Sequence, residues 1–267
     1  MKFTIITPNR NGERYLETAI RSVLSQRDTG IEVEYIVADG ASTDRSLAIL
    51  ERYRDQIDWM TSEPDNGPAS AINKGLRRAT GDVVAWLNAD DMYYPGALQR
   101  VARALESRPG AALGFGRCRI VDEENQEIRR GITRFKESFF PISTRFTIQC
   151  INYVSQPAMF FRRTAMERTG LLREDLKAAW DYEFLLRLWR QGGATRIAGS
   201  PLAAFRWHEA SISGTQFRRQ FKEEYDAAAA DAGRFAPQTL LHRGVRAGIV
   251  GIYSWMDRRR RIHARRH

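Results

Sequence analysis

Cysteine is scarce in this sequence, which has only Cys118 and Cys150 among its 267 residues. This scarcity excludes a disulfide scaffold, and no Cys/His group has the spacing of a zinc site. No run of about 18 apolar residues occurs, so we expect no transmembrane helix. The apolar start, MKFTIITP, is too short for a signal peptide and lacks a cleavage site, so we expect a cytoplasmic protein.

Several common signatures are missing as well. The segment TPNRNG, which follows the first apolar run, is not GxGxxG, and this disfavours a dinucleotide-binding site. The sequence has no Walker A motif, no GxSxG, no HExxH and no aromatic-interleaved basic motif of an RNA-binding domain. What is present is a hydrophobic fraction of 43% with six Trp, nine Tyr and thirteen Phe. Such a chain can bury a sizeable core, so wholesale disorder is excluded.

The basic excess is concentrated at the end of the chain. The 42 Lys and Arg residues outnumber the 32 Asp and Glu residues, which gives a net charge of +10. Residues 257–267, DRRRRIHARRH, carry half of this excess, and the segment 244–256 before them is apolar. A block of like charge is either a solvated tail or a contact with an anionic surface. The apolar segment before it favours peripheral contact with an anionic membrane, so no nucleic-acid partner is expected.

The first 110 residues alternate short apolar runs with helical patterns. This alternation predicts an α/β fold with a Rossmann-like, mostly parallel sheet flanked by helices. Ligands of such sheets bind beyond the carboxyl ends of the strands, where the polar clusters TPNRNG, ADGASTD, SEPDNG and LNADD lie. Strands are expected at residues 3–7, 33–38, 57–61 and 82–87, and helices at 14–26, from about 43, at 69–78 and at 96–107.

The second half of the chain is less regular. Residues 131–155 show no strong period, whereas 180–191 has the pattern of a buried helix. We expect a catalytic domain over residues 1–215 and a helical, basic C-terminal extension over 216–267. The other elements predicted are strands at 111–121 and 156–161, a hairpin turn at 122–127, and helices at 164–168, 216–232 and 238–257.

Acidic side chains follow several of the predicted strands. Asp90 and Asp91 come after a buried strand, where they either bind a hard divalent cation or form a turn that caps the next helix. Asp39 follows the second strand and either accepts a hydrogen bond from a nucleobase or ribose or opens an Asx-turn. Asp65 is equally ambiguous after the third strand, and Lys74 lies near the same loop.

Two residues later in the sequence can likewise be interpreted either as functional or as purely structural. Asp181 stands at the start of a well-patterned helix, where it is either a general base or a helix cap. His208, in FRWHEASIS, is either a metal ligand or neutral donor or a satisfied structural residue. These residues define the candidate site, but their spacing alone does not decide between the alternatives.

The order of these segments is similar to that of a known family. TPNRNGERYLETAIRSVLSQ, VADGASTDRSLAIL, SEPDNGPASAINKGL, GDVVAWLNADD, SQPAMFFRR, WDYEFLLRL and RWHEASIS together resemble inverting family 2 glycosyltransferases with the A-type fold. The resemblance extends over roughly residues 2–213 and is greatest to bacterial members that build cell-surface polysaccharides.

The resemblance implies a role for each matching residue. Asp181 corresponds to the catalytic base, and Asn88, Ala89 and Asp90 occupy the DxD position. A divalent cation, Mg²⁺ or Mn²⁺, is implied as cofactor, with Asp90, Asp91 and His208 as its side chains. The residues implied to bind the donor nucleotide are Thr7, Pro8, Asn9, Asp39, Asp65, Lys74, Asn88 and Ala89.

This chain departs from the family pattern at three places. Asn88 replaces the first Asp of DxD, Trp180 replaces the Glu before the base, and Asp39 stands alone where many relatives have two acids. The first change removes a ribose or metal contact, and the second alters acceptor recognition. None of the three removes the metal carboxylate or the base.

The expected function follows from this resemblance. The donor is a nucleotide-diphospho-sugar, expected to be a UDP-sugar, and the acceptor is a hydroxyl of a glycan or lipid-linked molecule. The transferred sugar is expected to be a hexosyl or N-acetylhexosaminyl unit, and the protein to be peripheral on the inner face of the membrane. Two alternatives are weaker. A sugar-nucleotide pyrophosphorylase needs a Gly-rich loop that TPNRNG does not supply, and a non-catalytic membrane- or nucleic-acid-binding protein leaves the acidic residues unexplained.

Overall fold

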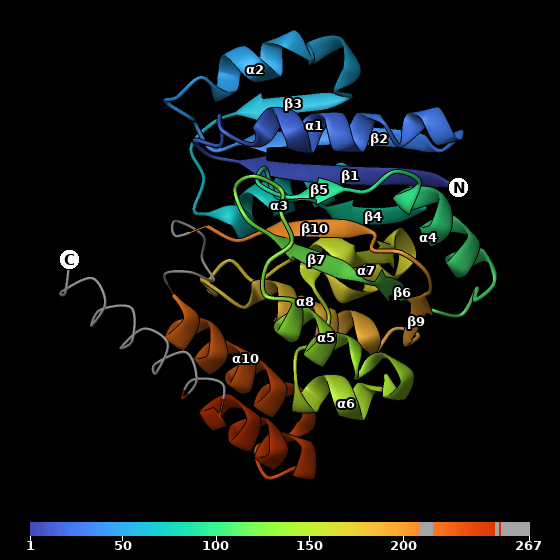
Figure 1. Ribbon diagram of the computed structural model, residues 1–267, viewed down its shortest axis with the longest axis vertical. Helices are drawn as coiled ribbons and strands as arrows, with labels where there is room; N and C mark the ends of the chain where they lie inside the picture. Colours follow the sequence, from blue (N-terminus) through green and yellow to red (C-terminus); the bar gives the residue numbers. More distant parts are fainter. Residues whose placement is uncertain (209–215, 249–250, 252–267) are drawn as a thin grey trace, which may run out of the picture.

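A computed structural model describes residues 1–208, 216–248 and 251 of the chain. Its centre is a seven-stranded sheet in the order β3-β2-β1-β4-β8-β6-β9 (Figure 1). The two pairs that β8 makes with β4 and β6 are antiparallel, and the other four pairs are parallel. The strands are β1 (Lys2–Asn9), β2 (Glu32–Asp39), β3 (Trp59–Ser62), β4 (Val83–Trp86), β6 (Leu113–Gly116), β8 (Met159–Arg162) and β9 (Ala194–Ile197).

The parallel half of the sheet brings the ends of its strands to one edge. Asn9 at the end of β1 pairs in register with Asp39 at the end of β2, and Asp39 pairs in turn with Ser62 of β3. Because the three strands end together, the polar segments that follow them share one edge. This is the edge at which the sequence predicts the site.

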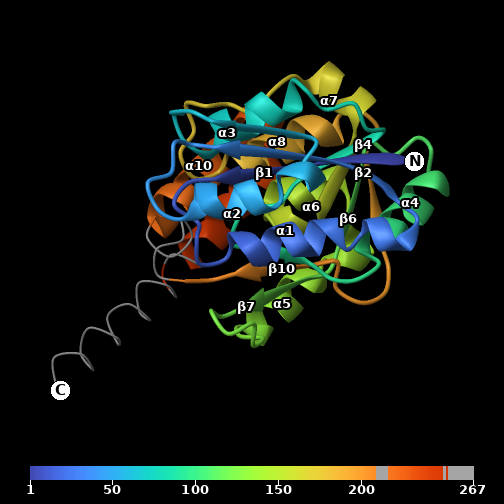
Figure 2. The same cartoon turned by 90° about the horizontal axis from the view of Figure 1, so that it is seen from above.

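Helices cover both faces of the sheet, because alternate residues of each strand point to opposite sides. On β1, Phe3 and Ile5 belong to one buried cluster with α1, α2 and α4, whereas Ile6 belongs to another with α3, α7 and α8. Figure 2 shows α1 on one side of β1 and α3, α7 and α8 on the other. The helices are α1 (Leu16–Leu24), α2 (Ser46–Arg52), α3 (Pro68–Leu76), α4 (Ala97–Glu106), α7 (Arg163–Thr169) and α8 (Trp180–Trp189).

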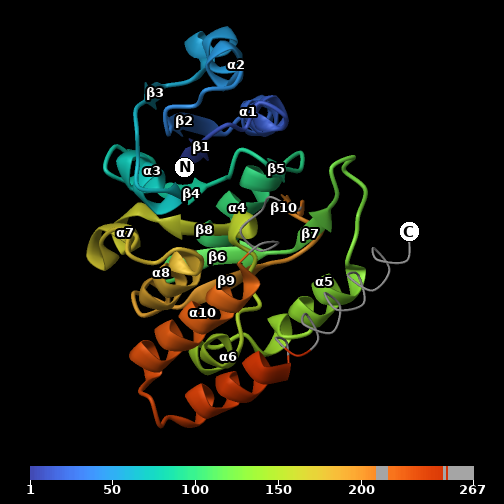
Figure 3. The same ribbon diagram turned by 90° about the vertical axis from the view of Figure 1, so that its left-hand side faces the viewer.

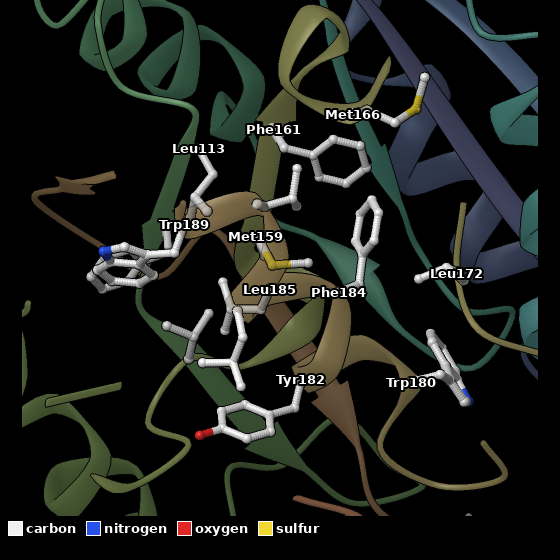
Figure 4. Close-up of a cluster of buried hydrophobic side chains, with 14 of the residues drawn as sticks. Leu113, Met159, Phe161, Met166, Leu172, Trp180, Tyr182, Phe184, Leu185 and Trp189 are labelled. Carbon is white, nitrogen blue, oxygen red and sulfur yellow. The ribbon is translucent and has the colours of Figure 1, made fainter. Parts of the chain in front are cut away.

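Helix α8 is buried around most of its circumference. Trp180, Tyr182, Phe184 and Leu185 are each at most 7% exposed, and Figure 4 shows them spread around the helix. The ring of Trp180 lies 5.7 Å from that of Trp86 at the end of β4. The helix that carries Asp181 therefore begins beside the strand that leads into LNADD.

A small second sheet, in the order β5-β10-β7, lies beside the main one. Strand β5 (Met92–Tyr93) follows the two acidic residues of LNADD, and β10 (Ala203–Arg206) leads to His208. Strand β7 (Cys118–Val121) runs parallel to β10 and leads into the hairpin turn predicted at 122–127. This sheet thus joins three segments that are far apart in the sequence.

The remaining helices form one end of the molecule. Figure 3 shows α5, α6 and α10 together below the main sheet. They are α5 (Arg130–Glu137), α6 (Arg145–Cys150) and α10 (Phe217–Ala232), and a further helical segment covers residues 237–248. Short 3-10 turns are η1 (Arg27–Thr29), η2 (Arg54–Gln56), η3 (Phe140–Ile142) and η4 (Gln156–Ala158).

Helix α10 packs on helix α8, which carries Asp181. Glu223 of α10 accepts hydrogen bonds at Oε2 from the backbone N–H groups of Ala178 (2.8 Å) and Ala179 (3.1 Å), just before α8 begins. The N-cap residue Ala179 has no side chain that could fill this role. A carboxylate at this position satisfies unpaired N–H groups and complements the helix dipole. The predicted C-terminal extension therefore caps the helix that carries Asp181.

Several expectations about individual elements need correction or limitation. The strand predicted at 111–121 forms two strands, β6 and β7, which belong to different sheets. The strand predicted at 156–161 begins only at Met159, because Gln156–Ala158 forms η4, with Pro157 in its first turn. Residues 131–155, which show no strong period, fold into α5 and α6, two helices of only eight and six residues. The expected helix over 238–257 is described to residue 248 and at 251, and the arginine-rich residues 257–267 lie outside the described part. Within the described residues, no helix is both long and apolar enough to cross a bilayer.

Candidate active site at the carboxyl ends of the strands

Asp39 lies at the centre of the first polar cluster. It is 0% exposed, and its carboxylate accepts four hydrogen bonds. The donors are Asn9 Nδ2 (2.7 Å), Ser42 N (2.9 Å), Ser42 Oγ (2.5 Å) and Ser62 Oγ (2.6 Å). Burial on its own would raise the pKa of Asp39, but the bonds from Ser42, Ser62 and Asn9 outweigh it and lower the pKa. Asp39 is therefore a carboxylate that ties together the ends of β1, β2 and β3.

The loops after β1 and β2 are joined along their length. Ser42 Oγ accepts the N–H of Asn11 at 2.8 Å, and Asn11 Oδ1 accepts the N–H of Thr43 at 2.8 Å. Gly12 is required at the turn, because a Cβ atom there would lie 2.3 Å from Asn9 Oδ1 and 3.2 Å from the Cβ of Ala89. At Gly12, the backbone of the TPNRNG segment therefore lies close to the side chain of Asn9 and to Ala89 of LNADD.

The first three residues predicted to bind the donor are buried. Thr7 is 0% exposed and accepts a hydrogen bond from the Tyr35 hydroxyl at 3.0 Å. Pro8 is buried as well, and Asn9 is 3% exposed. Their side chains therefore form the floor under the edge of the sheet and hold the surface residues above it.

Asp65 and Lys74 lie on the β3 side of this edge. Asp65 Oδ1 accepts the N–H of Gly67 at 2.8 Å, and its other oxygen packs so closely on Gly40 that a Cβ there would lie 2.4 Å away. The ammonium of Lys74 forms an ion pair with Glu63 at 3.0 Å. The structure thus brings Asp65 to the loop after Asp39, while Lys74 is paired with an acid that the sequence did not single out.

The two acids of LNADD have different surroundings. Asp90 is half-buried, with a side chain that is 29% exposed, and its Oδ2 lies 3.0 Å from Nε2 of His208. Asp91 is 1% exposed, and its oxygens accept bonds from the N–H of Arg206 (2.9 Å) and from Asn88 Nδ2 (3.1 Å). Burial and the neighbouring Asp90 carboxylate raise the pKa of Asp91 well above its usual range. Asp90 is thus the acid that faces outward, and Asp91 supports it from below.

Arg206 holds this region together, and the sequence analysis did not single it out. Although it is 1% exposed, its guanidinium donates to the carbonyl of Asp90 (2.9 Å), the carbonyl of Asp122 (2.6 Å) and Oδ1 of Asn125 (2.6 Å). It also lies over the ring of Tyr15, 4.5 Å from the centroid. Arg206 thereby holds the 122–127 hairpin against LNADD. Its position two residues before His208 was the only available signal.

The ring of His208 completes this corner of the site. It contacts Asp90 and lies 5.7 Å, centroid to centroid, from the ring of Tyr15. Within the described part of the chain, no three His, Cys, Asp or Glu side chains converge as a metal cage would require. Mg²⁺ is commonly held by only one or two carboxylates together with substrate phosphates. A pair with one carboxylate and one imidazole, Asp90 and His208, fits a cation whose other ligands come from a diphosphate.

The base candidate Asp181 lies in a second polar cluster. Burial raises the pKa of Asp181, while the N–H of Tyr182 (2.8 Å) and the nearby ammonium of Lys136 act in the opposite direction. Lys136 comes from α5 and donates to Ser155 Oγ at 3.2 Å. The next residue, Gln156, accepts from Asn88 at 3.3 Å and donates to the carbonyl of Trp86 at 2.7 Å. Ser155 and Gln156 therefore connect the Asp181 cluster with LNADD.

Lys136 and Gln156 show what sequence reasoning could and could not find. The sequence places Gln156 in SQPAMFF, where it was expected only to begin a strand. Lys136 lies in a segment without a strong period and far from Asp181 in the chain, so no spacing pointed to it. Two cavities of about 290 and 400 Å³ adjoin α5, but none of the predicted site residues lines either one.

The fold and the arrangement of these residues can now be compared with those of known proteins. The model of the family described as glycosyl transferase family 2 matches residues 4–170. The chain belongs to glycosyl transferase family 2. Because the chain belongs to this family, a glycosyltransferase is favoured over the two alternatives from the sequence, a sugar-nucleotide pyrophosphorylase and a non-catalytic binding protein.

Curated relatives of this family 2 glycosyltransferase come from several bacteria. An uncharacterized glycosyltransferase of Rickettsia typhi is 26% identical over 232 residues, which cover 84% of this chain and 69% of that protein. The poly(ribitol-phosphate) beta-N-acetylglucosaminyltransferase TarS of Staphylococcus aureus is 28% identical over 193 residues. That match covers 70% of this chain but only 32% of the relative, so this chain spans about a third of its length.

Solved structures show the same fold. Residues 1–349 of S. aureus TarS in complex with UDP-GlcNAc superpose with a TM-score of 0.70 and 20% identity, covering 89% of this chain and 68% of that one. A mannosyltransferase from Pyrobaculum calidifontis, in complex with GDP-Man and Mn²⁺, gives a TM-score of 0.62 and 17% identity, covering 95% and 79%. The predicted A-type fold of this family 2 glycosyltransferase is confirmed.

Proposed function

We propose that this family 2 glycosyltransferase moves a sugar from a nucleotide-diphospho-sugar to a hydroxyl group, with inversion at the anomeric carbon. The observation that carries the proposal is the 3.0 Å contact between Asp90 Oδ2 and His208 Nε2 at the edge of the sheet. The LNADD segment is linked to the cluster around Asp181, because Gln156 bonds to Asn88 and its neighbour Ser155 bonds to Lys136. The TarS and mannosyltransferase structures, which are complexes with UDP-GlcNAc and GDP-Man, support a nucleotide-sugar donor. A UDP-sugar is the donor that we propose, with a hexosyl or N-acetylhexosaminyl group transferred.

The donor nucleotide lies, in this proposal, along the ends of β1, β2 and β3. Asp39 holds the loops on which the nucleobase rests, because the four hydrogen bonds that its carboxylate accepts come from Asn9, Ser42 and Ser62. Thr7 and Pro8 form the floor, Asp65 and Lys74 flank the nucleotide, and Asn88 and Ala89 lead to the diphosphate. Asp90 and His208 would hold Mg²⁺ or Mn²⁺, with Asp91 as the support beneath them. The chemistry that such a cation supplies is neutralisation of the charge on the departing diphosphate.

Asp181 acts as the general base on the acceptor side. Its carboxylate takes the proton from the acceptor hydroxyl as the oxygen attacks the anomeric carbon on the face opposite the diphosphate. Burial makes the carboxylate a stronger base because it raises the pKa of Asp181, and the Lys136 ammonium limits that rise. A single displacement of this kind gives inversion.

A donor screen tests the proposed function directly. Nucleoside diphosphate release is measured with UDP-glucose, UDP-galactose, UDP-N-acetylglucosamine and GDP-mannose, each with Mn²⁺, with Mg²⁺ and with EDTA, beside thermal shifts for UDP and GDP. We expect cation-dependent release from at least one UDP-sugar and a larger thermal shift with UDP than with GDP. Absence of release from every donor, together with absence of any nucleotide-dependent shift, would contradict the proposal.

We also propose that the acceptor is glycan or lipid-linked, that the chain serves the building of a bacterial cell-surface polysaccharide, and that its C-terminus makes peripheral contact with an anionic membrane. The name of the TarS relative gives a poly(ribitol-phosphate) as that protein's acceptor, and this supports a polymeric acceptor with free hydroxyl groups. The six arginines of residues 257–267 support the membrane contact.

Deleting residues 257–267 is expected to reduce co-sedimentation with vesicles of phosphatidylglycerol and phosphatidylcholine. Each Lys or Arg near such a surface contributes about 1 kcal/mol. Added salt should reduce binding of the full chain more than binding of the truncated chain. Vesicles of phosphatidylcholine alone are the control. Equal binding by both chains would mean that residues 257–267 are only a solvated tail.

A further inference from the structure

An arginine-lined groove lies where helix α5 packs beside strand β7 (Figures 2 and 3). It consists of two adjoining cavities of about 290 and 400 Å³, and Arg117 and Glu137 line both of them. These volumes are close to the lower end of the range for ligand pockets, roughly 300–1,000 Å³. None of the residues proposed to bind the donor or to act as the base lines either cavity. The groove is therefore separate from the candidate active site.

The two walls of the groove follow from the periodicities of a strand and a helix. Arg117 and Arg119 are two residues apart at the start of β7, and side chains at this spacing point to the same face. Arg130, Arg134 and Glu137 recur at intervals of four and three residues on α5, so they share one side of that helix. All five residues line the larger cavity, so side chains from both walls converge there.

Positive charge exceeds negative charge along the groove. Five arginines and two glutamates line the two cavities. Glu137 Oε2 accepts two hydrogen bonds from the guanidinium of Arg117, at 2.9 and 2.6 Å. Glu127 Oε2 lies 3.5 Å from Nε of Arg130 and 3.9 Å from Nε of Arg119. The two carboxylates are thus shared among three of the five arginines.

The other two arginines have no acidic partner among the described residues, and one of them lies in each cavity. Arg134 lines the larger cavity, Arg196 lines the smaller one, and both are exposed. Neither guanidinium forms an ion pair or a hydrogen bond with any described residue, although that of Arg196 lies 5.9 Å from the centroid of the Phe140 ring. A guanidinium carries five N–H donors. Each cavity therefore contains a fork of donors that can bind an anion.

The number and arrangement of these donors favour phosphate over carboxylate. Arginine forks match the oxygen pairs of both groups. A carboxylate has only two oxygens, whereas a phosphomonoester has three strong acceptor oxygens and close to two negative charges. Three oxygens can accept from more than one of the four arginines that converge in the larger cavity. Because the donors lie in cavities and not on a flat face, a soluble ligand reaches them more easily than a headgroup held in a bilayer.

We propose that the arginine-lined groove binds a soluble small molecule with two phosphomonoester groups, of the class of the sugar bisphosphates. One phosphate contacts Arg134 in the larger cavity and the other contacts Arg196 in the smaller one, while Arg117, which lines both cavities, can donate to either. Such a ligand binds whether or not a donor is present. Because binding does not depend on Asp90 or Asp181, this inference is independent of the proposed function.

Site-resolved chemical labelling tests the proposal on the full chain without any donor. Phenylglyoxal modifies accessible arginines, and peptide mass spectrometry reports the modification rate of each one. The probes are fructose 1,6-bisphosphate, fructose 6-phosphate with a single phosphate, citrate as a tricarboxylate, and vesicles of phosphatidic acid and phosphatidylcholine, which hold a phosphomonoester in a bilayer. Arg54 and Arg108, exposed arginines that line neither cavity, are the internal controls.

Fructose 1,6-bisphosphate at about ten times its Kd is expected to slow the modification of Arg134 and Arg196 by about 10-fold, because about one chain in ten then remains free. Arg54 and Arg108 should react at an unchanged rate. Fructose 6-phosphate and citrate should need higher concentrations for the same effect.

A pair of double variants tests the same prediction by calorimetry. Arg134→Gln/Arg196→Gln should bind the bisphosphate at least about 10-fold more weakly, since a hydrogen bond to a charged group contributes about that factor or more. Arg54→Gln/Arg108→Gln removes two charges outside the groove and should bind as the unaltered chain does. Equal melting temperatures show that both variants fold. The arginine-rich residues 257–267 are present in every sample, so a difference between the two variants does not come from them.

Five outcomes would overturn the inference. Equal slowing at all four arginines would indicate general attraction to a basic surface. Equal protection and affinity with fructose 6-phosphate would indicate a site for one phosphate, and equal protection by citrate would indicate a carboxylate site. Protection by the vesicles without protection by the bisphosphate would indicate a lipid surface. Absence of protection by every probe would show that the groove binds no anion of these classes.

Discussion

Replacing Asp181 with Asn is expected to lower kcat by about 10²–10⁴-fold, the range typical of lost general-base assistance. The amide has nearly the same shape as the carboxylate but cannot take the proton of the acceptor hydroxyl. Asp181 lies on α8, whose Trp180 and Tyr182 are firmly packed, so the helix itself should not move. Steady-state release of UDP with a saturating donor and acceptor measures the effect.

Donor binding separates this loss from a structural one. The thermal shift produced by UDP and a divalent cation should be unchanged in Asp181→Asn, because the donor contacts that we propose lie at the ends of β1 to β4. Glu183→Gln is a useful comparison on the same helix, since Glu183 pairs with Arg187 at 2.8 Å. If Asp181→Asn turned over at nearly the normal rate, Asp181 could not be the base.

Replacing Asp90 with Ala is expected to remove most of the metal-dependent part of donor binding, by at least about 10²-fold in affinity for UDP. Loss of even an indirect partner of a metal ligand typically costs 10–100-fold, and Asp90 is the only carboxylate that we propose as a direct ligand. Titration calorimetry with UDP, with Mn²⁺ and with EDTA, measures the difference. The variant should bind UDP with a similar weak affinity in both solutions.

The control for Asp90 is an acid of similar type outside the site. Asp175 is exposed and pairs with Arg173, so Asp175→Ala should retain the metal dependence in full. His208→Ala should lie between the two, because Asp90 remains. UDP affinity in Asp90→Ala that still rose on addition of Mn²⁺ as it does in the unaltered chain would contradict the assignment.

The sequence predicts the donor half of the fold well. Strands β1, β2 and β4 contain strongly apolar runs, and each strand from β1 to β4 ends at a polar cluster. Helices with one apolar face follow β1, β2 and β3 directly and β4 after the short strand β5. Those local signals do not depend on distant contacts, so the edge at which Asp39 and Asp90 lie could be located from them. The relation of Asp90 to His208 came from the family resemblance, and the structure places the two side chains in contact.

The acceptor half could not be predicted in the same way. Helices α5 and α6 are short and only partly buried, so their residues show little periodicity. Arg206 and Glu224 are charged residues, for which the sequence alone favours solvent exposure, yet they are 1% and 4% exposed. Their burial depends on partners that lie elsewhere in the chain, such as Asp122 for Arg206 and Asn152 for Glu224. Only the folded chain shows these pairings.

The hydrogen bonds between Glu223 and the start of α8 indicate how far a fragment of this chain must extend in order to fold. A polypeptide stopped at residue 215 would lack the acceptor of the N–H groups of Ala178 and Ala179. It would also lack Ala227 and Ala228, which are buried in the same cluster as α8. The region matched by the family model stops earlier still, at residue 170, before the proposed base Asp181. The helical segment after α10 packs on the same region, because His242 is 3% exposed and its Nδ1 lies 2.9 Å from the carbonyl of Gln149. We therefore expect the smallest independently folding and active unit to run from the first strand through residue 248. Expression fragments and domain fusions should be cut beyond that residue.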